Sequence, residues 1–271
     1  MRGMFTCGVM DVLMENDIVF DGAAGISAGA TFGCNFKSRQ IGRPLRYNLE
    51  YCRDPRYCSL RSLIFTGDLY GASFCYRVLP DELDIFDREA YRQNPMDFYV
   101  GATEVTKAEI AYRNCLKADD TEMQWIRASA SMPFVSRAVE IEGKKYLDGG
   151  IVDAVPYGIM VKNGYEKLVL ILTQPAGYRK SPMGLKRLTK LLLRKYPALY
   201  EALLRRHEMY NRQMDEIDAR EKSGQWLVMR PPEKLGVNRV EKHPDRLEKA
   251  YLVGKSEANA RLEQIKTYLC S

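Results

Sequence analysis

The chain has 271 residues with a formal net charge of +6, and 46% of its residues are hydrophobic and 28% charged. This composition is typical of a globular protein and excludes the disordered and fibrous classes. The longest uncharged run, residues 22–36, consists mostly of small side chains and is too short to span a membrane. Seven cysteines without a C-x-x-C pair and only two histidines predict that there is no metal site. Together with a charged N-terminal segment, they predict a cytoplasmic protein.

Apolar positions recur at helical spacing over residues 4–14, so a helix is predicted almost at the start of the chain. A short buried strand is predicted over residues 19–25, and a second helix begins at Ala28. Residues 41–95 mix helical patterns with turn signals. We interpret them as helices and loops that form a wall or cap near the functional site.

Residues 96–103 alternate in polarity and are rich in aromatic and β-branched side chains, which predicts a strand, and residues 109–112 are expected to pair beside it. A helix follows and ends before Pro133. Residues 144–147 predict a short strand. The continuous apolar run at residues 167–173 predicts a core strand that is buried on both faces. Strands that alternate with helices predict an α/β sandwich with a mostly parallel central sheet flanked by helices.

The pattern changes after this core strand. Residues 183–222 predict a long charged helical segment whose leucines pack on the rest of the protein, and a strand at residues 225–230 and a terminal helix at about residues 245–268 follow. Because a strand returns after the basic helices, we interpret them as an insertion. Residues 1–178 are then the core, and residues 179–271 form an extension whose strand and terminal helix complete the same domain.

Positive charge is concentrated between Arg179 and Arg212, where ten Lys or Arg residues stand against Glu201 and Glu208, a local net charge of +8. The rest of the chain then carries −2. Such a segment favours contact with an anionic surface, either lipid headgroups or nucleic acid. Nucleic acid is the less favoured partner because the tyrosines of the segment fit a packed helical stripe as well as a stacking platform. A merely solvated helical face is an equal alternative to membrane contact.

One motif points to chemistry: residues 25–29 read Gly-Ile-Ser-Ala-Gly, a G-x-S-x-G pattern between a predicted strand and a predicted helix. This order is typical of a nucleophile elbow, in which the serine, here Ser27, lies at a sharp turn with its hydroxyl exposed. Gly25 and Gly29 are expected to flank the tight crossing, where a Cβ would collide with the neighbouring segment. The alternative is a packing turn with an incidental serine.

A serine nucleophile needs a base to take its proton. The contexts of His207, on the basic helix, and His243, in a turn, predict solvated surface residues rather than members of a triad. Asp148 stands at the end of a predicted strand and can project toward the same edge of the sheet as the elbow. From the Asp-Gly dipeptide alone, a turn-capping role for Asp148 is equally well supported.

The G-x-S-x-G motif, Asp148-Gly149-Gly150 and the intervening segment at residues 128–134 resemble the patatin-like phospholipases over about residues 2–174. The later part resembles the C-terminal extension of bacterial members. The resemblance implies a three-layer α/β sandwich with a Ser-Asp dyad, in which Ser27 is the nucleophile and Asp148 is the general base, and it implies no cofactor.

The family forms its oxyanion hole from a G-G-G-x-R-G loop. Of this loop the chain has only Arg2-Gly3, so the resemblance implies that Gly3 supplies part of the hole, with Arg2 in its loop, and that the first strand and the other glycines lie upstream of Met1.

The predicted function is therefore a serine acyl hydrolase that cleaves lipid or phospholipid acyl esters through an acyl-serine intermediate, in the cytoplasm or peripheral to an anionic membrane. Two alternatives remain open at this stage. One is acyl transfer to an alcohol on the same dyad. The other is a catalytically impaired scaffold, with an incomplete oxyanion loop, that binds acyl lipids or a protein partner.

Overall fold

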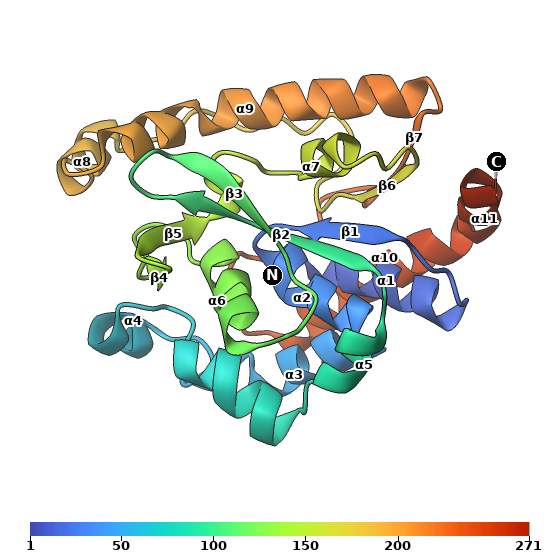
Figure 1. The fold of residues 1–271 in the computed structure, drawn as a ribbon, viewed down its shortest axis with the longest axis horizontal. Coiled ribbons are helices and arrows are strands. Elements are labelled where there is room, and N and C mark those ends of the chain that lie inside the picture. The colour runs from blue at the N-terminus through green and yellow to red at the C-terminus, as the bar shows by residue number, and fades with distance from the viewer. Residues whose placement is uncertain (271) are drawn as a thin grey trace.

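The computed structural model describes residues 1–270 (Figure 1). The strands are β1 (Gly22–Gly25), β2 (Asp97–Glu104), β3 (Glu109–Asn114), β4 (Val139–Ile141), β5 (Lys144–Asp148), β6 (Leu168–Ile171) and β7 (Trp226–Met229). The helices of the first half are α1 (Met4–Glu15), α2 (Ala28–Lys37), α3 (Arg43–Tyr51), α4 (Leu60–Thr66), the π-helix η1 (Phe74–Leu83), α5 (Arg88–Gln93) and α6 (Asp120–Ser129). Those of the second half are the 3₁₀ turn η2 (Gly149–Ile151), α7 (Tyr157–Lys162), α8 (Lys186–Leu192), α9 (Pro197–Lys222), α10 (Pro244–Ala260) and α11 (Leu262–Cys270).

The strands form a five-stranded sheet and a two-stranded sheet. In the first, β2 pairs with β1, β3 and β5, and β4 pairs with β5, while β6 and β7 form the second. The pairs joined through helices, β1–β2 and β6–β7, are parallel. The β2–β3 and β4–β5 hairpins and the β2–β5 pair are antiparallel. Long crossovers between parallel strands need helical connections, which explains this division.

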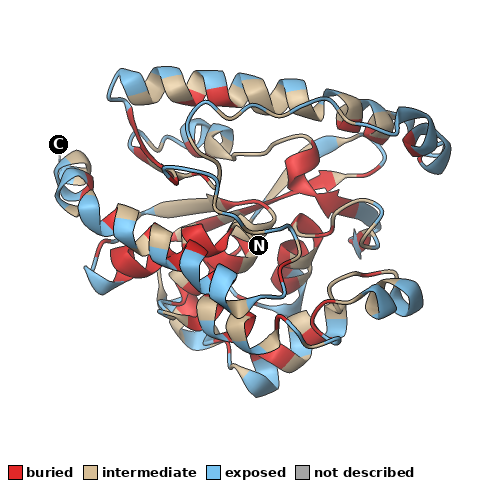
Figure 2. Ribbon diagram, turned by 180° about the vertical axis from the view of Figure 1, so that it is seen from behind, coloured by how far each residue is buried: buried red, intermediate tan, exposed pale blue. Residues whose placement is uncertain are grey.

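Helices cover both faces of the strands. In Figure 1, α7 and α9 lie on one side, and α1, α2, α3, α5, α6 and α10 lie on the other. Figure 2 shows that buried residues gather in the strands and in the helix faces that meet them, whereas the outer surfaces of the helices are exposed. The α/β sandwich predicted from the alternation of strands and helices is therefore confirmed.

The helix at the start of the chain, α1, is buried almost all round because α10 covers the side that faces away from the strands. Two glycines make this close approach possible. A Cβ at Gly8 would lie 2.1 Å from the carbonyl oxygen of Tyr251, and one at Gly254 would lie 2.1 Å from that of Phe5. Helix α10, which belongs to the extension, therefore packs directly against a helix of the core.

Several predicted boundaries and burial patterns were wrong. The first strand begins at Gly22 rather than at residue 19, where Val19 is 72% exposed. The run at residues 167–173 is not buried on both faces, since only alternate residues of β6 are fully buried. The long helical segment divides before Pro197 and the terminal helix divides at Arg261.

The leucines at the start of the basic segment do not pack on the protein. Exposed leucines on and beside α8 are Leu185, Leu188, Leu191 and Leu192. In contrast, Leu199 and Leu203 of α9 are buried in a cluster with Leu147 of β5. The predicted packing therefore holds for α9 and fails for α8. No helix within residues 1–270 is long and apolar enough to cross a membrane.

Candidate active site

The sharp turn between β1 and α2 is centred on Ser27. Its backbone dihedral angles are φ 55° and ψ −118°, a region that a residue with a Cβ rarely occupies. Such strain persists only where the surrounding structure enforces it, and it is common at functional sites. The strand–turn–helix order predicted from the G-x-S-x-G motif is present in the structure.

The two glycines of the motif differ in what they do. A Cβ on Gly25 would lie 2.4 Å from the carbonyl oxygen of Gly29, so only glycine fits there. A Cβ on Gly29 would meet nothing within 4 Å. The predicted steric requirement for glycine therefore holds at position 25 and is wrong at position 29. The crossing places the backbone of Gly29 against position 25, whereas a side chain at position 29 would point into open space.

The strand register explains why Ser27 and Asp148 meet. Because β3 occupies one edge of β2 along its pairing from Tyr99 to Glu104, β1 and β5 must both lie on the other edge. β1 runs parallel to β2 and ends opposite Val100, whereas β5 runs antiparallel and ends opposite Ala102. The C-terminal ends of β1 and β5 therefore meet on the same edge of β2. Ser27, which lies just after β1, and Asp148, the last residue of β5, face each other there.

Ser27 Oγ donates a hydrogen bond of 2.6 Å to Asp148 Oδ2, and the Gly150 N–H donates one of 2.7 Å to Asp148 Oδ1. Asp148 is only 4% exposed. Burial raises the pKa of this carboxyl, while the Ser27 hydroxyl, the Gly150 N–H and the nearby Arg206 and Lys180 charges oppose the rise. A raised pKa makes the carboxylate a better proton acceptor near neutral pH.

Close packing limits the size of the side chain at the two positions after Asp148, and both positions are glycine. A Cβ on Gly149 would lie 2.5 Å from the carbonyl oxygen of Gly101 on β2. A Cβ on Gly150 would lie 3.0 Å from Asp148 Oδ1, where its N–H now donates. Glycine at position 149 lets the loop turn tightly over β2, and this turn keeps the carboxylate aimed at the elbow.

The segment after α6 ties the two halves of the site together. Ser129 Oγ accepts a hydrogen bond of 2.9 Å from the Ser27 N–H, and the Ser131 carbonyl oxygen accepts one of 2.8 Å from the Asp148 N–H. Thr103 of β2 adds a third tie by donating 2.9 Å to the Asp148 carbonyl oxygen. Sequence reasoning singled out residues 128–134 by resemblance alone. Their structural role could not be read from local patterns because each partner is distant in the chain.

Two helix N-termini converge beside the elbow. Gly3 precedes α1, and a Cβ on it would lie 2.5 Å from the Phe32 ring and 3.0 Å from the Ala28 Cβ. The backbone N–H groups of Arg2, Gly3 and Ala28 have no hydrogen-bond partner within residues 1–270. Unpaired N–H groups at helix N-termini favour negative charge. Gly3, predicted as part of an oxyanion hole, therefore lies against the elbow helix. The sequence reasoning did not name Ala28, although the N–H of the residue after an elbow serine is the general expectation for an oxyanion donor.

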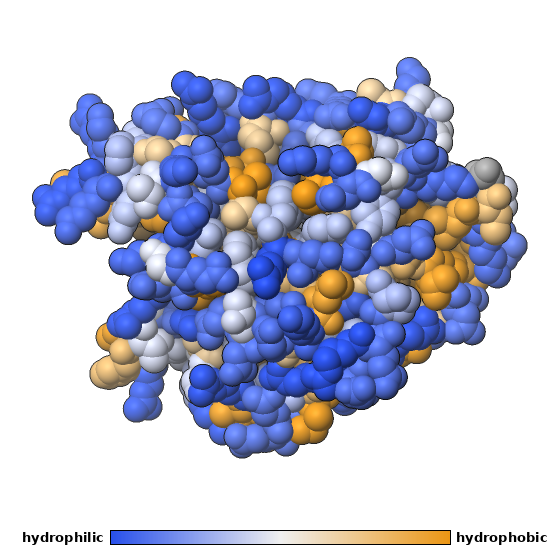
Figure 3. Space-filling view, viewed as in Figure 1, coloured by the Kyte–Doolittle hydropathy of each residue, from blue (hydrophilic) through white to orange (hydrophobic). Residues whose placement is uncertain are grey.

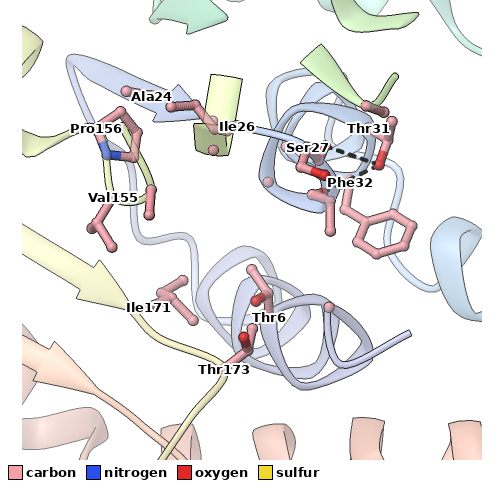
Figure 4. Close-up of a pocket in the computed structure, with 18 of the residues that line it drawn as sticks. Thr6, Ala24, Ile26, Ser27, Thr31, Phe32, Val155, Pro156, Ile171 and Thr173 are labelled. Carbon is pink, nitrogen blue, oxygen red and sulfur yellow. Dashed lines mark hydrogen bonds between the residues drawn. The ribbon is translucent and has the colours of Figure 1, made fainter. Parts of the chain in front are cut away.

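A cavity of about 1540 Å³ opens onto this site. Figure 4 shows its border between the elbow at Ser27, the residues Val155 and Pro156, Thr6 of α1, and the end of β6 near Thr173. The segment predicted as a wall or cap contributes one side of the cavity, through Tyr47, Tyr57, Leu69, Tyr70, Tyr76 and Leu79. That prediction is confirmed.

Neither histidine forms a hydrogen bond with Ser27 or Asp148 among the described residues. His243 is exposed at the start of α10. His207 is half-buried and lines the cavity, so the prediction of a solvated surface residue was wrong for it. Its Nδ1 lies 3.0 Å from the Leu204 carbonyl oxygen, within its own helix. Among the described residues no group of three or more His, Cys, Asp or Glu side chains is placed to hold a metal ion.

Helix α9 braces the loop that carries Asp148. Arg206 Nε donates a hydrogen bond of 2.5 Å to the Gly150 carbonyl oxygen. Gln213, two turns along, accepts hydrogen bonds from the N–H groups of Ala154 and Val155 and donates one to Asp153. The extension therefore contacts the site directly, which composition and charge alone did not indicate.

Comparison with known proteins agrees with this geometry. Residues 1–161 match the family described as patatin-like phospholipase, and residues 196–270 match a domain of unknown function, DUF6363. Because the first match covers more than half of the chain, the protein belongs to the patatin-like phospholipase family. The family is one of lipid hydrolases. An uncharacterized protein of Escherichia coli K-12, YjjU, is 29% identical over 204 residues, which are 70% of this chain and 54% of YjjU. The chain thus spans about half the length of this curated relative.

Proposed function

We propose that the protein is a serine acyl hydrolase that cleaves lipid acyl esters through an acyl-Ser27 intermediate, with Asp148 as the general base. The observation that carries this proposal is the 2.6 Å hydrogen bond from Ser27 Oγ to Asp148 Oδ2, made by a serine in a strained turn and a carboxylate that is 4% exposed. A structural Ser-Asp contact would need neither the strain nor a cavity in front of the hydroxyl.

In the first step Ser27 Oγ attacks the ester carbonyl carbon while Asp148 Oδ2 accepts the hydroxyl proton. The carbonyl oxygen becomes an oxyanion, and the free N–H groups of Ala28 and Gly3 are its proposed donors. One such donor is commonly worth about 10²- to 10³-fold in rate. When the intermediate collapses, the carbon–oxygen bond to the leaving alcohol breaks, and Asp148 returns the proton to that alcohol. Water then attacks the acyl carbon while Asp148 accepts its proton, the bond from that carbon to Ser27 Oγ breaks, and Asp148 returns the proton to Ser27 Oγ as the carboxylic acid leaves.

The surrounding contacts fix the orientation that these steps need. The Gly150 N–H holds one carboxylate oxygen of Asp148 and leaves the other for Ser27. The Ser129 hydroxyl occupies the Ser27 N–H, so this amide is not free to stabilise the oxyanion. The donors therefore come from the residue after the nucleophile and from the start of α1.

A fluorophosphonate probe tests the nucleophile. We expect the probe to label the parent protein and to lose the label in Ser27→Ala, because only an activated hydroxyl attacks the phosphorus at a useful rate. Ser181→Ala is the matched control, since Ser181 lines the same cavity and should keep the label. Labelling that survives in Ser27→Ala would show that another group is the nucleophile.

A further inference from the structure

Six Lys or Arg residues line the cavity, and four of them interact electrostatically with one another beside Asp148: Arg2, Lys180, Arg206 and Arg239. They come from four separate parts of the chain, and three of them belong to the segments that follow β6. Within residues 1–270 none of the four forms an ion pair with a carboxylate. Asp148 is the carboxylate that interacts with Lys180 and with Arg206.

Neighbouring cations on the outer side of the same elements are paired. Arg179, next to Lys180, forms ion pairs with Asp215 at 2.6 Å and with Asp218 at 2.9 Å. Arg230 pairs with Asp218 at 3.0 Å. Arg179 and Arg230 thus have carboxylate partners, whereas the four cations beside Asp148 form no ion pair within residues 1–270.

Lys180 is held in the cavity and cannot move freely into solvent. Its Nζ lies 4.1 Å from the centre of the Tyr210 ring. Its backbone exchanges two hydrogen bonds with the Asn211 side chain, at 2.8 and 3.1 Å. Burial, followed by the charges of Arg206, Arg2 and Arg239 in that order, lowers the pKa of Lys180 to about 7, while Asp148 opposes them.

The guanidinium group of Arg206 is held at one nitrogen, Nε, and its other nitrogens have no hydrogen-bond partner in the described part of the chain. Its Nε donates to the Gly150 carbonyl oxygen, and this is the one hydrogen bond that the guanidinium makes within residues 1–270. A guanidinium carries five N–H donors in a planar fork that matches an oxyanion. Burial also lowers the pKa of Arg206. Burying a cation whose N–H donors have no partner costs free energy, and a bound anion that accepts hydrogen bonds from these donors offsets the cost.

We propose that Lys180, Arg206 and Arg239, with Arg2, form a binding site for an oxyanion of the phosphate type that is part of the acyl-ester substrate and lies next to the scissile bond. The identification of the oxyanion as part of the substrate rests on the proposed function. The proposal gives the extension a role, because Arg206 and Arg239 lie in the segment that matches the domain of unknown function.

The site predicts a proton change on binding. An anion beside Lys180 favours its charged form, so binding raises the pKa of Lys180 from about 7. Above that pH the free protein holds mostly neutral lysine, and an oxyanion that binds there brings a proton with it. Affinity for the anion therefore falls as the pH rises above the pKa of the free side chain.

The first experiment compares two soluble esters that differ in charge, monobutyryl glycerol phosphate and monobutyryl glycerol. The measured quantity is the ratio of their kcat/KM values. We expect this ratio to fall by about tenfold or more in Lys180→Gln and in Arg239→Gln, because each removes a charge-assisted contact to the phosphate. Arg205→Gln is the matched control, since Arg205 precedes Arg206 on α9 but is exposed and lies outside the cavity. Its ratio should equal that of the parent, and ratios that also stay unchanged in the Lys180 and Arg239 variants would overturn the proposal.

The second experiment needs no catalysis. Inorganic phosphate is titrated calorimetrically into Ser27→Ala at about pH 8, in two buffers with different ionisation enthalpies. We expect binding with proton uptake, and loss of the uptake in Ser27→Ala/Lys180→Gln.

The two experiments separate the possible failures. If neither ester is hydrolysed but phosphate binds with proton uptake, the oxyanion site stands and the hydrolase function falls. If the esters are cleaved without charge preference while phosphate binds, the site serves free phosphate, and its assignment to the substrate is overturned. Absence of phosphate binding together with an unchanged ratio overturns the site itself.

Discussion

At the scale of single residues, the pKa of Asp148 determines how activity should respond to pH. Burial raises this pKa above the ordinary value of 3.8, and the base must be ionised to accept the Ser27 proton. We therefore expect kcat/KM for a neutral soluble ester to rise with pH through the raised pKa and then to level off. A pH–rate profile measures this acidic limb.

The variant Asp148→Asn tests whether the acidic limb of the pH–rate profile reports the ionisation of Asp148. It keeps the shape of the side chain and an oxygen for the Gly150 N–H, but it cannot accept the proton. We expect a loss of about 10²- to 10⁴-fold in kcat/KM and a flattened acidic limb. An unchanged limb in the variant would assign the titration to another group.

The elbow glycines offer a matched pair of substitutions. Gly25→Ala places a Cβ 2.4 Å from a backbone oxygen that cannot move without opening the turn, so we expect a loss of about 1–3 kcal/mol in the free energy of unfolding. Gly29→Ala meets open space and lies in α2, so its stability should be equal to that of the parent or higher. Thermal unfolding measures both, and equal losses in the two variants would contradict the steric argument.

The residues of the site were predictable to different degrees. Ser27 could be selected because the elbow motif is a local signal, whereas Asp148 was preferred over a turn-capping role only through the resemblance to the family. Ser129, Thr103 and Arg206 could not be selected, since each acts through a contact with a residue that is distant in sequence. These contacts depend on strand register and on the path of α9, and neither is encoded in a short window.

At the scale of elements, α8 differs most from expectation. Its leucines were predicted to pack inward, yet Leu185 is 78% and Leu191 63% exposed. Periodicity places apolar residues on one face of a helix but does not say whether another element covers that face. For α9 the sheet and the loop after β5 cover the stripe, whereas nothing within the described part of the chain covers that of α8.

Exposed leucines interleaved with Lys186, Arg187, Lys190 and Arg194 suit an anionic membrane surface better than water. Helix α4, on the same side of the molecule in Figure 1, exposes Leu60, Ile64 and Phe65. At the edge of the molecule where α8 and α4 lie, Figure 3 shows small hydrophobic areas among a mostly hydrophilic surface. We propose that α8 makes a peripheral contact with anionic lipid.

Vesicle sedimentation with increasing anionic lipid tests this contact. Because one basic residue near such a surface contributes about 1 kcal/mol, we expect Lys186→Glu/Lys190→Glu to bind anionic vesicles at least about tenfold more weakly than the parent. Lys222→Glu/Lys249→Glu makes the same charge change at two exposed sites outside this segment and is the matched control. Equal binding by the two double variants would mean that α8 is simply a solvated helix.

At the scale of the whole molecule, the sequence predicted the α/β class because periods of helix and strand alternate along the chain. It could not predict that α10 would close over α1, since that contact joins the two ends of the chain through a glycine on each helix, Gly8 and Gly254. It also could not predict that α9 would reach Gly150 through Arg206. Both contacts bind the extension to the core, so the boundary near residue 178 is expected to separate segments of one cooperative unit.

The two tryptophans make this expectation measurable. Trp125 of α6 packs on Tyr146 within the core, and Trp226 of β7, in the extension, packs on Tyr157 of the core. Trp226→Phe leaves a reporter in the core, and Trp125→Phe leaves one at β7. Urea unfolding of each variant is followed both by tryptophan fluorescence and by circular dichroism, so that each substitution is corrected for its own effect on stability. In a single cooperative unit the fluorescence and dichroism transitions of each variant coincide, because neither region can unfold while α10 remains on α1 and α9 remains on the Asp148 loop. If the core fluorescence and the β7 fluorescence bracketed the dichroism transition, residues 1–178 and 179–271 would be separate domains, and the support that α9 gives to Asp148 would then be an inter-domain contact.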